Sequence, residues 1–128
     1  MTQKEAVDRW LAGAEDAWDT AQTLLKAKKY DHSLFFLHLA LEKIIKAVFI
    51  KNNDNHPPLI HYLDRLAEAA GITLSLEQKL QLIEANSFNT SGRYEDYKFK
   101  LYKKATPEYT KKWHQTGRKL FDYFKGKL

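Results

Sequence analysis

The sequence contains no cysteine, and only three prolines and five glycines among its 128 residues. Without cysteine, the protein forms no disulfide framework, no thiolate zinc site and no cysteine nucleophile. The start, MTQKEAVDRW, lacks the basic and apolar segments of a signal peptide, and the longest apolar run, LFFLHLAL, is too short to span a bilayer. These absences predict a cytoplasmic protein with no membrane partner.

Motifs that mark common catalytic and cofactor sites are missing as well. The sequence has no GxxxxGK[ST], GxGxxG, GxSxG or HExxH pattern, so it predicts no phosphate-cradling loop, no nucleophile elbow and no cofactor. His38 and Glu42 have the helical spacing of metal ligands, but two side chains do not make a metal site. We expect His38, Glu42 and Lys46, spaced by four, to pair with one another on one helix face.

The charge is distributed unevenly along the chain. Residues 1–92 carry 10 Lys/Arg and 12 Asp/Glu, whereas residues 93–128 carry 11 and 4, so the positive excess lies in the last third. A clustered positive charge is typical of a protein with an anionic partner, such as a nucleic acid or an acidic protein face. The alternative is a solvated basic face that only keeps the protein soluble.

Apolar residues in the first half recur at steps of three and four, which predicts helices. The first helix is expected over residues 3–28. The second follows the connector KKYD, ends in KNNDNHPP and carries two apolar stripes. These are Leu34, Leu37, Leu41, Ile44 and Val48, and beside them Phe36, Ala40, Ala47 and Ile50. Because four helices do not easily bury two stripes of one member, we expect a homodimer through this second-helix region.

Two shorter helices are predicted in the middle of the chain. The third runs from Leu59 to Ala70 and is closed by a glycine. A Ser-x-x-Gln capping box then begins a fourth helix, which ends near Asn86. The apolar stripe of this fourth helix consists of Leu76, Leu80 and Ile83.

The stretch FNTSGRYEDYKFKLYKK, residues 88–104, departs from helical spacing. It opens with the loop-forming NTSG, and its YKFKLY alternates with a period of two, which allows a short extended segment. Thr106 and Pro107 then predict the start of an amphipathic last helix. A lone strand would not change the class, so we predict an all-α up-and-down bundle of four to five helices in a single domain, residues 1–128.

Taken in order, four features resemble a HEPN domain, a small helical domain often encoded beside a minimal nucleotidyltransferase in prokaryotes. The features are FFLHLALEKIIKAVF in the second helix, His61 in IHYLDRL, then Asn86, and finally GRYEDY. The resemblance covers nearly the whole chain. It implies a five-helix bundle that dimerises, in a family that includes RNA-cleaving toxins, nucleotide-binding accessory subunits and inert scaffolds.

The RNA-cleaving members of that family carry an Arg followed, after four to six residues, by a His. The resemblance implies that the Arg binds phosphate and the His moves a proton. Arg93 has the expected place, but the permitted positions for the His hold Lys98, Phe99 and Lys100. Because the motif is not intact, we do not expect RNA cleavage by the usual route, although His61 remains an alternative base. It also remains a candidate capping or packing residue.

We predict that the surface around Arg93 binds a nucleotide or RNA, although an ordered loop with solvated lysines is the alternative. The candidate residues are Arg93, Tyr94, Asp96, Tyr97 and Lys98, flanked by Asn86 and His61. The leading hypothesis is a homodimeric accessory subunit of a two-gene, toxin–antitoxin-like module with a minimal nucleotidyltransferase partner. The other hypotheses are an RNase-type toxin that uses Arg93 with a non-standard base, and a structural scaffold.

Overall fold

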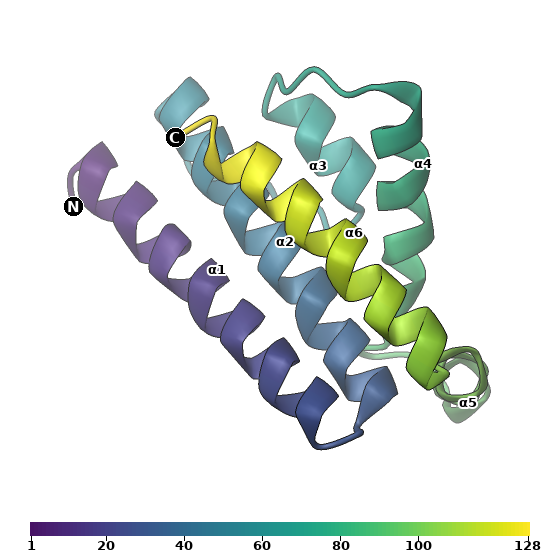
Figure 1. Cartoon of the computed structure of the whole chain (residues 1–128). Coiled ribbons are helices and arrows are strands. Elements are labelled where there is room, and N and C mark those ends of the chain that lie inside the picture. Colours follow the sequence, from purple (N-terminus) through teal and green to yellow (C-terminus); the bar gives the residue numbers. More distant parts are fainter.

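The computed structural model describes all 128 residues, contains helices and no strand, and confirms the predicted all-α bundle. Three long helices, α1, α2 and α6, lie side by side, α3 and α4 lie to one side of them, and α5 lies near one end (Figure 1). The elements are α1 (Gln3–Lys26), α2 (Tyr30–Asn53), α3 (Leu63–Ala69), α4 (Leu76–Ala85), the 3₁₀ turn η1 (Asn86–Phe88), α5 (Glu95–Lys104) and α6 (Pro107–Lys125). None of the helices has the combination of length and apolar character needed to cross a membrane.

The starts of α4 and α6 lie where their sequence signals predict them. The Ser75 hydroxyl accepts from the backbone N–H of Gln78, whose side chain accepts from the N–H of Ser75, so the capping box of α4 is complete. The Thr106 hydroxyl accepts from the N–H of Tyr109, and Pro107 is the first residue of α6. In each case a side-chain oxygen satisfies a backbone donor that the first helical turn leaves unpaired.

The central helix is α2, which packs against α1, α3 and α6. Thirteen of its 24 residues are buried, including members of both predicted apolar stripes. Close packing against α6 depends on Gly117, where an added Cβ would lie 2.9 Å from Cδ1 of Leu37. A single chain therefore buries most of both stripes, with Phe36 partly covered, so their burial does not by itself require a homodimer.

The predicted apolar stripe of α4 faces solvent instead of the core. Leu76, Leu80 and Ile83 are 72%, 57% and 45% exposed, whereas Leu82 and Ala85 are fully buried. Periodicity identifies an apolar stripe but does not say which of two faces packs inward.

Glu84 holds α4 in this rotation. Its Oε2 accepts from the hydroxyl of Tyr109 at 2.6 Å and from Nε1 of Trp113 at 2.8 Å, which ties α4 to α6. Burial alone would raise the pKa of Glu84, but these two hydrogen bonds, with Lys104 and Lys112 nearby, lower it. The carboxylate is thus kept ionised, in the form that accepts both bonds.

Two further boundaries differ from the prediction. The third helix begins at Leu63 rather than Leu59, so His61 lies in the connection before it. Residues 95–104 form α5 instead of an extended segment, and Leu101 is the one buried residue of this helix. Glu95 and Asp96 in the first turn and lysines in the last turn complement the helix dipole, which favours the helix despite its alternating pattern.

Two buried histidines are held in the neutral form. Nε2 of His114 donates to the hydroxyl of Ser33 at 2.6 Å, and that hydroxyl donates to the carbonyl of Ala21. Nδ1 of His114 has no hydrogen-bond partner. Burial lowers the pKa of His114 to about 4, and burial also lowers the pKa of His38 to about 4 against an opposing effect of Glu42. Protonating either ring would place a further charge in the protein interior.

We predict that the fold loses stability as the pH falls from 6.5 to about 4. In that window the unfolded chain binds protons at His38 and His114 that the folded chain does not bind, so the free energy of unfolding decreases. The decrease is roughly 1 kcal/mol per pH unit for each histidine. Urea unfolding across this range, compared between the wild type and His114→Gln, should show a shallower slope in the variant.

The exposed His56 supplies the matched control, since His56→Gln should keep the wild-type slope. Equal slopes for the wild type and His114→Gln would contradict the assignment.

Candidate functional site

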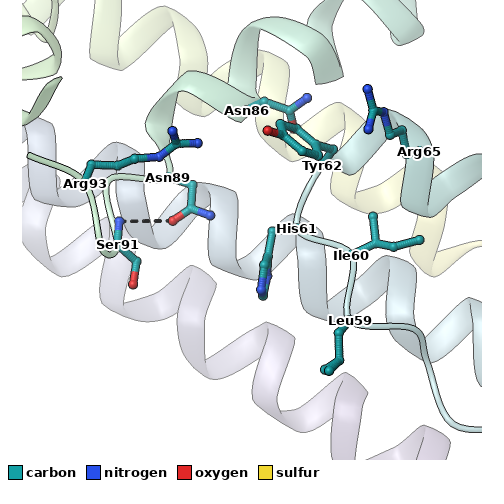
Figure 2. Close-up of a pocket in the computed structure, with 9 residues that line it drawn as sticks. All are labelled: Leu59, Ile60, His61, Tyr62, Arg65, Asn86, Asn89, Ser91 and Arg93. Carbon is teal, nitrogen blue, oxygen red and sulfur yellow. Dashed lines mark hydrogen bonds between the residues drawn. The ribbon is translucent and has the colours of Figure 1, made fainter.

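A surface pocket of about 460 Å³ lies between the connection that precedes α3, α3 itself and the segment between η1 and α5. In Figure 2, Arg93 extends from one side and Arg65 stands on the other, with Tyr62 and Asn86 between them. The lining residues are Leu59, Ile60, His61, Tyr62, Arg65, Asn86, Asn89, Ser91 and Arg93. Three predicted site residues, Arg93, His61 and Asn86, are thus brought together.

Arg65 and Arg93 carry the positive charge of this pocket. Each guanidinium lies over a tyrosine ring, Arg65 at 4.9 Å from the ring centroid of Tyr62 and Arg93 at 4.8 Å from that of Tyr97. Neither arginine forms an ion pair with a carboxylate, and Arg93 makes none with the nearby Asp96. Stacking fixes the plane of a guanidinium and leaves its N–H groups available for an anion.

His61 connects the pocket to a buried ion pair in α2. Its Nδ1 lies 3.3 Å from Oε1 of Glu42, whose Oε2 accepts from Nζ of Lys46 at 2.9 Å. Nε2 of His38 donates to the backbone carbonyl of His61 at 3.2 Å. The predicted pairing of Glu42 with Lys46 is confirmed, whereas His38 bonds the backbone of His61 instead of Glu42. No set of three ligand-type side chains is arranged to hold a metal ion.

Asn86 has a structural role in the pocket wall. Its Oδ1 accepts from the backbone N–H of Leu63 at 2.8 Å, and its Nδ2 donates to Oδ1 of Asp64 at 2.8 Å. The residue at the N-cap of α3, Tyr62, makes no capping hydrogen bond with its own side chain, so Asn86 supplies the missing cap from the end of α4. Both ends of the amide are thereby occupied.

The remaining predicted site residues do not line the pocket. Tyr94 is 89% exposed at the N-cap of α5, and Lys98 lies 3.7 Å from Glu95. Asp96 is exposed, and Tyr97 contributes only the ring beneath Arg93 and a long bond of 3.4 Å to the carbonyl of Ser87.

Sequence reasoning missed Arg65 as a member of the site. It also missed Tyr62, Asn89 and Ser91. Tyr62 and Arg65 lie three residues apart at the start of α3 and form a cation–π pair. This spacing is the one feature of the sequence that could have indicated that the two side chains lie together. Arg65 and Arg93 belong to segments that only the folded chain brings to one pocket.

These observations define the protein as a helical bundle with a surface pocket lined by arginines. Comparison with protein families matches residues 7–127 to the HEPN domain. The match covers nearly the whole chain, and the protein belongs to the HEPN domain family. Among curated proteins nothing matches, and among solved structures nothing matches either.

We predict that Asn86→Ala lowers the free energy of unfolding. The substitution leaves the N–H of Leu63 and the carboxylate of Asp64 without their partner, which should cost about 1–2 kcal/mol of unfolding free energy. Urea unfolding measures the loss. In the same pocket, Asn89 accepts only from the N–H of Ser91, so Asn89→Ala should change stability by less than about 0.5 kcal/mol. Similar losses in both variants would remove the capping role.

Proposed function

We propose that the protein is a binding subunit that holds a phosphate-bearing ligand of the nucleotide class in the pocket between Arg65 and Arg93. The observation that carries the proposal is the presence of two guanidiniums, neither paired with a carboxylate, in one pocket. Arginine matches phosphate oxygens with two parallel N–H donors, and an unpaired arginine needs to break no ion pair to do so.

The other lining groups suit the rest of a nucleotide. Tyr62, Asn89 and Ser91 offer an aromatic face, an amide and a hydroxyl beside the guanidiniums. A volume of about 460 Å³ falls in the range of small-molecule pockets. No carboxylate lines the pocket, so the local charge favours an anion.

The exposed stripe of α4 supports a contact with another protein. Leu76, Leu80 and Ile83 lie on the face of α4 opposite the buried Leu82 and Ala85. Three adjacent large aliphatic side chains in water favour an interface. We place the homodimer contact on this stripe rather than on α2. Family membership supports the further proposal that the partner enzyme is a minimal nucleotidyltransferase in a toxin–antitoxin-like module.

RNA cleavage is the second candidate function, and the setting of His61 is the observation that favours it. Glu42 holds Nδ1 of His61, Nε2 has no protein partner, and Arg93 lines the same pocket. A carboxylate behind a histidine is a recurrent way to orient a general base. Incubating RNA with the wild type, His61→Gln and Arg93→Ala decides between the two functions. If the wild type cleaves RNA and neither variant does, the protein is an RNase and the proposal of a binding subunit is wrong.

We predict that Arg65→Ala and Arg93→Ala each weaken binding of ATP about tenfold, because each removes one charged hydrogen-bond donor to phosphate. Isothermal titration with ATP measures the change. Arg9 is exposed on α1, forms no ion pair and lies outside the pocket, so Arg9→Ala should bind ATP as the wild type does. Wild-type affinity in the double variant Arg65→Ala/Arg93→Ala would refute the site.

We predict that the protein is a dimer at tens of micromolar and that Leu80→Glu makes it a monomer. The substitution places a charge in the middle of the stripe that the contact would bury. Light scattering gives the mass in solution. Leu59 is 92% exposed and lies outside α4, so Leu59→Glu should remain dimeric. A monomeric wild type would rule out the homodimer.

A further inference from the structure

The outward face of α5 carries an exposed pair of aromatic rings. Phe99 and Tyr102 are 59% and 63% exposed, their ring centroids lie 6.1 Å apart, and their planes differ by 15°. Of the other six phenylalanines, Phe88, Phe121 and Phe124 are fully buried and the remaining three are partly buried. The two rings stack on each other in water, three residues apart on a helix, and most of their apolar surface is not covered by the core.

A lysine lies against this surface, and more lysines lie in the neighbouring segments. Nζ of Lys103 lies 5.6 Å from the ring centroid of Phe99. Residues 26–32 and 98–104 together contain seven lysines and one aspartate. The net positive charge of these two short segments is therefore larger than the net charge of the whole chain, which is +5. The basic character of the last third of the sequence is therefore continued by the turn between α1 and α2.

The two segments meet around a second cavity, of about 630 Å³. It lies between the α1–α2 turn and the end of α5, and it includes Lys28, Lys29, His32, Tyr102 and Lys103 among its lining residues. Asp31 is the one carboxylate in its wall. Lys28 has a φ of 61°, a left-handed conformation that glycine or asparagine usually adopts after a helix. Lys28 therefore adopts a backbone conformation that would strain glycine less, and it lines the cavity.

We infer that this surface, Lys28, Lys29, Phe99, Tyr102 and Lys103, binds single-stranded nucleic acid. The lysines would contact the phosphates, and a base would extend the stack of the two rings from an outer face. Bases offer their faces in this way when they are not paired in a duplex. An acidic peptide would satisfy the lysines but has no flat ring for each aromatic residue. This surface is separate from the Arg65–Arg93 pocket, since the two share no lining residue.

The test uses fluorescence anisotropy with a labelled oligouridine of about ten nucleotides, a length within the range of single-strand sites. We expect Phe99→Ala/Tyr102→Ala to weaken binding at least tenfold. Phe99→Leu/Tyr102→Leu should weaken it comparably, because leucine keeps the apolar character but cannot stack. Wild-type affinity in the leucine variant would overturn the inference.

The lysines are tested by salt. Lys29→Ala/Lys103→Ala should make the dependence of affinity on salt shallower by roughly one to one and a half in the logarithmic slope. Lys111→Ala/Lys119→Ala, an equal change of charge on α6 outside the cavity, should leave the slope unchanged. Equal slopes in both double variants would mean that the overall positive charge of the protein attracts the RNA, and would contradict a binding site at these lysines.

Competition with four unlabelled ligands separates the ligand classes. Oligouridine should be displaced by unlabelled oligouridine but not, at equal phosphate concentration, by uridine monophosphate, polyglutamate or vesicles of anionic lipid. Displacement by any of these would overturn the assignment to a nucleic acid strand. Arg65→Ala/Arg93→Ala should bind oligouridine as the wild type does, so this inference and the proposed nucleotide pocket stand or fall separately.

Discussion

The buried carboxylate of Glu42 is the constraint on which the pocket depends. Glu42 lies in the middle of the central helix and is almost fully buried. An ionised carboxylate in that position needs partners, and it has one from its own helix, Lys46, and one from the following connection, His61. Because His61 and His38 also tie the backbone of that connection to α2, the chain reaches the start of α3 at a fixed place. Arg65 takes its position in the pocket from that start.

The opposite wall is fixed by Asn86 in a similar way. Its amide caps α3 from the end of α4, so the segment that leads to Arg93 is attached to the segment that carries Arg65. The side chains that build the pocket therefore have their polar groups paired, and the side chains that offer charge to a ligand do not. The physical reason is desolvation. An unpaired polar group loses its hydrogen bonds to water when it is buried, which destabilises the fold, but it keeps them when it is exposed. The guanidiniums can be left unpaired because they lie at the surface.

The sequence predicted the parts of the fold that depend on local chemistry. The capping box at Ser75 and the start of α6 at Thr106 were correct, since caps are formed within a few residues. The rotation of α4 was not predictable from its own stripe, because contacts of Glu84 with Tyr109 and Trp113 on α6 decide it. The same limit applied to the site. Arg93 was expected from the family resemblance, but Arg65 enters through packing between distant segments, and the role of Asn86 is visible only when α3 needs a cap.

The short helix α5 separates the two surfaces proposed to bind anions. Arg93 precedes it, whereas Tyr102 and Lys103 lie at its end. The Arg65–Arg93 pocket and the cavity beside Tyr102 and Lys103 share no lining residue, so they are two separate places on the surface. Leu101 is the one buried side chain of α5, so almost the whole helix remains available for contact with a ligand. The long helices supply stability, and the weakly buried α5 can display charge and aromatic rings without disturbing the core.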